Sequence, residues 1–223
     1  MPNTQTTRDR LIDAAYELAR RKGFDRTSIA EVMEAADVGK GSLYHHFPDK
    51  ASLGLAVLER DREVFMTMID DCLTASTPLE GLDRFLTTAL ERHRETGFVG
   101  GCLWGNTALE MSDSNPAYAQ RVAAVFDEWI GKLAETIRAG QDRGMIRADF
   151  PATDLARSVV ASVEGGIMLS RLTKEAAPLR ACLASLRAML TAAPPKSPAS
   201  GVGETRRQRI QATGDNDADI PTP

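Results

Sequence analysis

Residues 27–50 read TSIAEVMEAADVGKGSLYHHFPDK, and this stretch decides the fold. Ser28 stands three residues before Glu31, which is the spacing of a capping box at the start of a helix. A break over residues 37–39 follows, and then a short helical segment that ends before Pro48, because the residue before a proline avoids helical angles. Two short helices joined by a tight turn predict a helix-turn-helix, whose second helix enters the major groove of DNA.

The second of these helices, expected from about Lys40 to His46, has two faces. Leu43 and Phe47 are four residues apart, so they share one face and anchor the helix to a core. The glycines at positions 39 and 41 allow the backbone to approach DNA closely. The side chains that point away from the anchor are those of Lys40, Ser42, Tyr44 and His45.

Helical spacing continues on both sides of this motif. Apolar residues recur at a helical period in residues 7–22, with Thr6 or Thr7 as a cap and Gly23 as a stop. No stretch shows sustained period-two alternation, so we expect an all-α protein of about nine helices. The further helices are expected at about 50–73, 78–96, 102–111, 116–142, from a cap at Thr153 or Asp154 to 172, and 176–191.

The chain divides into three parts. Residues 1–50 form the predicted helix-turn-helix domain, and residues 51–193 form a larger helical domain. Residues 194–223 are rich in Pro, Gly, Ser, Thr and Asp and almost lack large apolar side chains. Such a segment cannot bury enough surface to offset the entropy of ordering, so we predict a disordered tail.

Composition sets the broad class. The 223 residues are 43% hydrophobic and 26% charged, with a net charge of −4, as in soluble globular proteins. Among residues 1–50, eight basic side chains balance eight acidic ones, so net charge alone gives DNA binding no support. Three widely spaced cysteines fit neither a disulfide framework nor a zinc site. With no signal core and no long apolar run, we expect a cytoplasmic protein without a membrane partner.

The motif resembles the TetR/AcrR family of transcriptional regulators. The resemblance rests on residues 27–29 (TSI), residues 39–47 (GKGSLYHHF) and the pair 49–50 (DK), and residues 7–22 fit the first helix of the family. It covers about forty residues in order; the later helices match only in number and order. It implies a three-helix DNA-binding domain followed by a helical ligand-binding and dimerisation domain.

The resemblance also implies DNA contacts by position. Thr27 and Ser28 are expected to contact phosphate at a helix N-terminus, and Lys50 to do so from the start of the fourth helix. Within the recognition helix, the expected contacts are Lys40, Gly41 and Ser42 at the groove, Tyr44 and His46 on phosphates, and His45 on a base edge. One helix-turn-helix makes few base contacts, which favours a homodimer on a near-palindromic operator of double-stranded DNA. The adjacent histidines point about 100° apart on a helix, so we predict no metal site.

An effector pocket is expected in the larger domain. Its predicted lining is Phe65, Met68, Ile69, Cys102, Trp104, Asn106, Glu110, Phe126, Trp129, Glu164 and Met168. Most of these residues are equally suitable for a core, whereas the amide and the two carboxylates could orient a small molecule.

A separate hypothesis concerns the reactivity of the Cys102 thiol. It stands near an expected helix N-terminus, where amide dipoles lower the pKa of a thiol, and this favours a reactive sensor. The alternative is a small buried hydrophobic residue, which is the usual state of free cysteine.

The last two helices carry more apolar residues than one face needs, and they include Gly165-Gly166, whose cost inside a helix suggests close helix packing. We interpret them as a dimer interface, with a protomer core as the alternative.

These features predict a repressor that leaves its operator when a small molecule binds or when Cys102 is modified. An activator, or a repressor that needs a corepressor, remains open. An enzyme is disfavoured, because no cofactor site, metal cluster, phosphate loop or nucleophile motif occurs, and His93 is expected to be solvent-exposed on a charged helix. A helical adaptor that uses its first domain for protein contacts is a further alternative.

Overall fold

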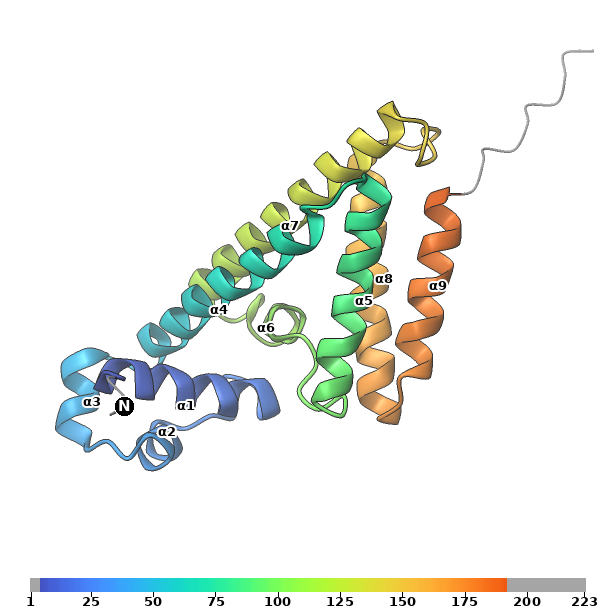
Figure 1. The fold of residues 1–223 in the computed structure, drawn as a ribbon. Coiled ribbons are helices and arrows are strands. Elements are labelled where there is room, and N and C mark those ends of the chain that lie inside the picture. The colour runs from blue at the N-terminus through green and yellow to red at the C-terminus, as the bar shows by residue number, and fades with distance from the viewer. Residues whose placement is uncertain (1–4, 192–223) are drawn as a thin grey trace, which may run out of the picture. The chain divides into compact units, whose positions relative to one another are not determined.

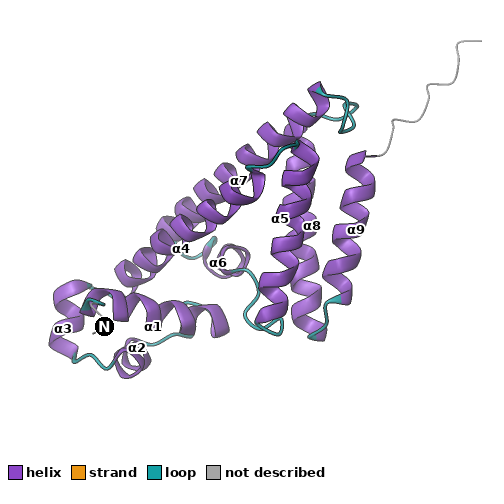
Figure 2. Ribbon diagram, viewed as in Figure 1, coloured by secondary structure: helices purple, strands orange, loops and turns teal. Residues whose placement is uncertain are grey.

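The computed structural model describes residues 5–191, and the predicted tail at 194–223 lies outside the described residues. The described part consists of nine helices and contains no strand (Figures 1 and 2), as the sequence predicts. They are α1 Thr7–Lys22, α2 Ile29–Ala36, α3 Lys40–His46, α4 Lys50–Leu73, α5 Pro78–Glu95, α6 Leu103–Met111, α7 Pro116–Asp142, α8 Ala152–Thr173 and α9 Ala177–Thr191. Between residues 5 and 191, no helix is both long enough and apolar enough to cross a membrane.

Local capping explains where most helices begin. The predicted capping box at the start of α2 is confirmed: the Ser28 hydroxyl accepts from the Glu31 amide, and the Glu31 carboxylate accepts from the Ser28 amide. The predicted cap of α8 is wrong. Pro151, with φ −56° and ψ 138°, precedes that helix, and no side chain caps it. The helix starts at Ala152, before the expected caps Thr153 and Asp154, and the fixed φ of Pro151 suits this entry.

Helices α1 to α3 form a unit that we call the reading head (residues 7–46). Leu11, Val32 and Leu43, one from each helix, are buried within it together with Phe47. The predicted anchors of the short third helix, Leu43 and Phe47, are therefore confirmed. Asp49 caps α4, so that helix starts directly behind the reading head and leads the chain into the remaining helices.

Leu43 gives a stability prediction. It is 0% exposed, whereas Leu109 on α6 is 86% exposed. We expect Leu43→Ala to lower the free energy of unfolding by about 2–5 kcal/mol, because it removes buried methyl groups and leaves a cavity. Leu109→Ala is the matched control and should change it by less than about 0.5 kcal/mol. Urea unfolding followed by circular dichroism measures both, and equal effects would contradict the assigned anchor.

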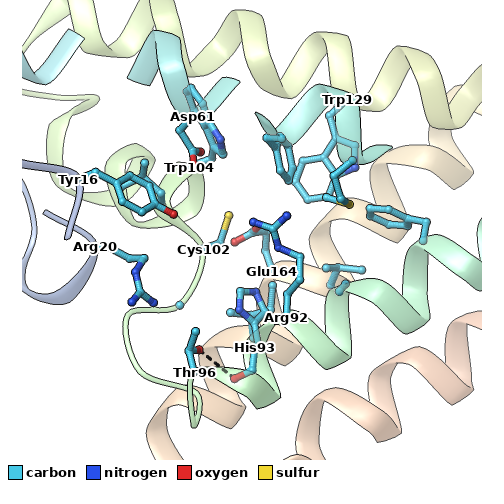
Figure 3. Close-up of a pocket in the computed structure, with 18 of the residues that line it drawn as sticks. Tyr16, Arg20, Asp61, Arg92, His93, Thr96, Cys102, Trp104, Trp129 and Glu164 are labelled. Atoms are coloured by element: carbon cyan, nitrogen blue, oxygen red, sulfur yellow. Dashed lines mark hydrogen bonds between the residues drawn. The ribbon is translucent and has the colours of Figure 1, made fainter. Parts of the chain in front are cut away.

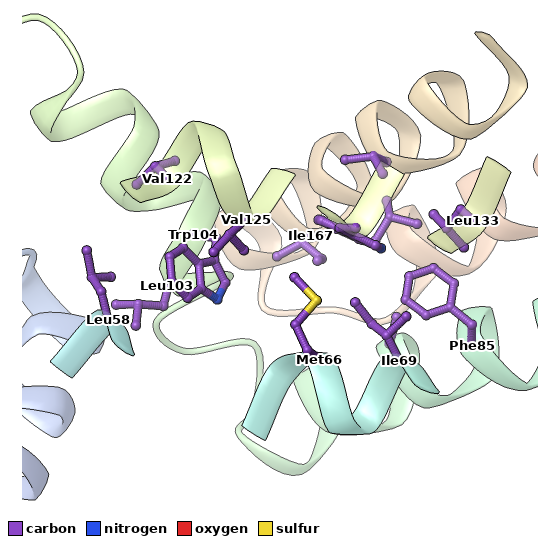
Figure 4. Close-up of a cluster of buried hydrophobic side chains, with 14 of the residues drawn as sticks. Leu58, Met66, Ile69, Phe85, Leu103, Trp104, Val122, Val125, Leu133 and Ile167 are labelled. Atoms are coloured by element: carbon purple, nitrogen blue, oxygen red, sulfur yellow. The ribbon is translucent and has the colours of Figure 1, made fainter. Parts of the chain in front are cut away.

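The remaining helices, α4 to α9, form the body of the protein. Helix α8 packs along α7 and α9. Figure 4 shows side chains from α4, α5, α6, α7 and α8 meeting in one apolar cluster that includes Trp104 and Phe85. A Cβ on Gly166 would lie 2.8 Å from the Leu179 side chain, so this glycine permits the close approach of α8 and α9. Most of the apolar residues of α8 and α9, which the sequence suggested for a dimer interface, are buried within the protomer, among them Val159, Ile167 and Leu183.

Candidate DNA-binding surface and effector pocket

The exposed face of α3 presents most of the predicted DNA contacts. Lys40, Ser42, Tyr44 and His45 are exposed, and His46 is partly buried. The Tyr44 ring lies 6.0 Å from the Lys40 Nζ atom. A Cβ on Gly39 or Gly41 would meet nothing within 4 Å. The backbone at the start of α3 is therefore open to a partner surface.

The N-terminus of α2 differs from the expectation. Thr27 is only 5% exposed, and its hydroxyl donates to the Gly23 carbonyl at 2.7 Å. The structure thus opposes a phosphate contact by this side chain. Ser28 is exposed, but its hydroxyl donates to the Glu31 carboxylate. Hydrogen bonds from Lys22 and Ser28 lower the pKa of Glu31 to about 2, so a negative charge already lies at this helix terminus.

Lys50 has a contact inside the protein. Its ammonium group donates to the Asp25 carbonyl at 2.8 Å, while the residue stays exposed. Lys50 therefore ties the start of α4 to the turn between α1 and α2. Its phosphate contact remains a prediction.

A cavity of about 280 Å³ lies where α1, α4, α5, α6, α7 and α8 meet (Figure 3). Aromatic rings supply much of its wall: the Phe65 ring centroid is 5.1 Å from that of Trp129, and Phe85 is 6.0 Å from the same indole. The predicted pocket residues that line it are Phe65, Met68, Cys102, Trp104, Trp129 and Glu164.

Three apolar residues of the predicted pocket do not line this cavity. Ile69 is fully buried in the core, and Phe126 lies behind Trp129, with their ring centroids 5.7 Å apart. Met168 is 59% exposed, although the residue before it on the same helix, Ile167, lines the cavity. Helical spacing could not separate these positions from true lining residues, because core and pocket lie on neighbouring stripes of the same helices.

Two polar residues that were predicted for the pocket form hydrogen bonds with main-chain groups instead. The Asn106 amide donates to the Gly100 carbonyl, and its oxygen accepts from Arg171 at 2.8 Å. The Glu110 carboxylate accepts from the amides of Phe24 and Asp25. Neither residue lines the cavity, so their predicted role as ligand contacts is corrected.

Several polar residues that were not predicted for the pocket line the cavity, namely Tyr16 and Arg20 of α1, Asp61 of α4, and Arg92, His93 and Thr96 at the end of α5. The expectation for His93 was wrong: it is partly buried at the cavity, and burial lowers its pKa to about 4, which keeps the imidazole neutral at pH 7. No local pattern marks these side chains, because the cavity exists only where distant helices meet.

The cavity disfavours charged forms of its acids. Burial raises the pKa of Asp61, although the nearby Arg92 guanidinium acts in the opposite direction. Burial likewise raises the pKa of Glu164. The Trp129 Nε1 and Glu164 Oε1 atoms are buried without a hydrogen-bond partner among the described residues. Both atoms are buried polar groups that lack, within the described part of the chain, the hydrogen bond such groups normally make.

Cys102 precedes α6 as its N-cap, as expected. The lowered thiol pKa that the sequence predicted is wrong. Burial, together with the negative charge of Glu164 beside it, raises the pKa of the thiol well above its ordinary value (Figure 3). Hydrogen bonds from the backbone of Gly105 and Trp104 act in the opposite direction but are smaller. The dipole argument fails mainly because the thiol is buried, and the Glu164 carboxylate of α8 beside the sulfur adds to the rise in pKa.

This shift predicts slow thiol chemistry. We expect Cys102 to react with iodoacetamide at pH 7.5 more slowly than a cysteine of the unfolded chain, because less of it is thiolate. Glu164→Gln removes the neighbouring charge and should speed the reaction. Mass spectrometry of quenched samples measures both rates. A native Cys102 that reacts faster than unfolded cysteine would restore the sensor hypothesis, unless a Cys102→Ser variant still responds normally to electrophiles.

The reading head and the open face of α3 define a helix-turn-helix DNA-binding protein. The family model "Bacterial regulatory proteins, tetR family" matches residues 11–57, and "Tetracyclin repressor-like, C-terminal domain" matches residues 78–186. The chain belongs to the TetR family and is a DNA-binding transcriptional regulator. Regulators of this family are dimeric.

Named relatives cover most of the chain. It is 31% identical over 180 residues to the transcriptional regulator AcuR of Cereibacter sphaeroides, covering 80% of this chain and 82% of the relative. It is 26% identical to the transcriptional repressor DhaR of Mycobacterium sp. strain GP1, covering 77% and 86%. The crystal structure of a regulatory protein TetR from Rhodobacter sphaeroides matches with a TM-score of 0.78 and 30% identity, over 82% of this chain and 98% of that one.

Proposed function

We propose that this protein is a homodimeric repressor that binds a near-palindromic operator through α3 and leaves it when a small molecule occupies the cavity. One observation carries the proposal: Tyr16 and Arg20 of the reading head line the same cavity as Cys102, Trp104 and Glu164 of the body. A ligand there contacts both parts at once. It can therefore stabilise an arrangement of the reading head that no longer fits DNA. DhaR, a relative, carries the name of a repressor, which supports this direction of control.

The cavity restricts the effector. Its volume of about 280 Å³ is at the small end of ligand sites. Aromatic and aliphatic side chains, including Phe65, Phe85 and Ile167, suit an apolar body. The unpartnered Trp129 N–H needs an acceptor. We infer a small effector with an apolar body and a polar, hydrogen-bond-accepting end.

The proposed dimer uses α8. Met168, Leu169 and Leu172 form an exposed apolar strip on this helix, which is unusual on a solvated surface. A Cβ on Gly165 of the same helix would meet nothing within 4 Å, so that backbone is accessible to another helix. A second copy of the chain fits this strip, since a two-fold interface brings identical patches together.

A release assay tests the effector proposal. Small amphiphilic compounds are screened for release of a fluorescent duplex that covers the region upstream of the gene for this protein. For a compound that releases it, Trp129→Phe should weaken the response about tenfold through loss of one hydrogen bond. DNA affinity without the compound should stay unchanged. An unaltered response in the variant would show that the compound acts elsewhere.

A further inference from the structure

Helix α6 connects the cavity to the reading head. Its first turn contributes Leu103 and Trp104 to the cavity wall, directly after Cys102. Its last turn carries Glu110, whose two carboxylate oxygens reach the turn between α1 and α2. One oxygen accepts from the Phe24 amide at 2.9 Å and the other from the Asp25 amide at 2.8 Å. A nine-residue helix thus has the cavity at one end and the reading head at the other.

The turn is shaped to receive this carboxylate. Gly23 has φ +91°, which disfavours any residue with a side chain, and a Cβ there would collide with the carboxylate of Glu110. Hydrogen bonds from backbone amides to an ionised carboxylate are stronger than neutral ones. Glu110 therefore holds two consecutive amides in one orientation.

Two other helices, α7 and α4, also contact this turn. The Phe24 ring packs edge-on against Tyr118 of α7, with centroids 5.3 Å apart. Lys50 at the start of α4 donates to the Asp25 carbonyl. Phe24 itself is buried. Three elements of the body therefore contact the turn that leads into α2, and Glu110 makes the contact from α6, the short helix whose first turn lines the cavity.

The cavity end of α6 is attached to α8. Arg171 of α8 donates to the Asn106 side chain at 2.8 Å, and Gly105 leaves room for the carboxylate of Glu164. Glu164 lines the cavity. A molecule that binds beside Glu164 and Trp104 therefore contacts α6 at one end, and the other end of α6 binds the turn between α1 and α2 through Glu110.

We infer that Glu110 is a positioning residue: it couples occupancy of the cavity to the placement of the reading head through its two bonds to the α1–α2 turn. The inference rests on the proposed function. Because coupling between two sites is reciprocal, DNA binding must also alter the cavity end of α6.

That reciprocity gives a test without a known effector. The chain has two tryptophans, so Trp129→Phe leaves Trp104 as the reporter at the cavity. The probe is a duplex selected from a random-sequence library by the full-length protein, with a scrambled duplex beside it. We expect the selected duplex to change Trp104 emission. In the same background, Glu110→Ala should abolish the change even at saturating duplex and weaken affinity about tenfold. Leu109→Ala, the exposed neighbour, should behave like the parent.

The Trp104 emission at saturating duplex distinguishes a positioning role of Glu110 from a role in the stability of the reading head alone. A variant with only a less stable head would still show the full emission change once duplex saturates it, and that result would overturn the inference. Glu110→Gln keeps the side-chain size and covers the case in which Glu110→Ala does not fold; it should show a reduced change. A parent that binds the selected duplex without any emission change would also overturn the inference. A parent that binds both duplexes alike would contradict the proposed function itself.

Discussion

The double variant Lys40→Ala/Tyr44→Ala is expected to lose about thirtyfold or more in operator affinity, since each of the two lost DNA contacts costs about 1–3 kcal/mol. Tyr44 is 46% exposed, and Lys40 lies over its ring at the start of α3. The two side chains therefore form one cationic and aromatic surface. Their removal takes away contacts with the DNA without opening a hole in the core.

The physical signature of this loss is its dependence on salt. A phosphate contact releases condensed counterions, so each lost contact should lower the slope of log affinity against log salt by about one. Fluorescence anisotropy at several salt concentrations gives affinity and slope together. Arg143→Ala, at an exposed arginine that follows α7, is the matched control for removal of positive charge. An unchanged affinity in the double variant, with an intact fold by circular dichroism, would place the DNA surface elsewhere.

The second large effect is expected at α8. Met168 is 59% exposed and Leu172 is 80% exposed, so Met168→Glu/Leu172→Glu should leave the protomer folded. Charges at the centre of the proposed two-fold interface would face their own copies, and desolvating like charges is costly. We expect a monomer by sedimentation, with operator affinity reduced by about a hundredfold or more because linked half-sites no longer act together.

The control for this variant is Val64→Glu, which places the same charge at an exposed apolar position of α4. It should remain dimeric and bind DNA like the parent. A dimer that survives the double charge on α8 would contradict the proposed interface. A monomer that keeps full operator affinity would contradict the need for two reading heads.

Much of the fold was predictable because local signals agree with tertiary ones. The bounds expected for the helices of the reading head match α1 and α3, and the capping box at Ser28 marks the entry to α2. Leu43 and Phe47 were recognisable as anchors from their spacing alone. The predicted side-chain cap of α8 was wrong, because the helix begins directly after Pro151.

The site was less predictable, because it depends on contacts between distant segments. Aromatic pocket residues such as Trp104 and Trp129 could be proposed, since large apolar side chains gather in any cavity of a helical body. Tyr16 and His93 could not, because each takes its role from helices far away in the sequence. Glu110 was assigned to the wrong partner: a lone carboxylate does not reveal that two amides some 85 residues away will bind it.

The central claim, control of one specific DNA site by the reading head, is tested most directly by titrating the purified protein against the duplex upstream of its own gene at two salt concentrations, using fluorescence anisotropy. We predict tight binding to one site, with one dimer or a pair of dimers, that weakens steeply as salt rises. Weak binding to that duplex and to unrelated DNA alike, with the same result for duplexes selected from a random library, would contradict the claim.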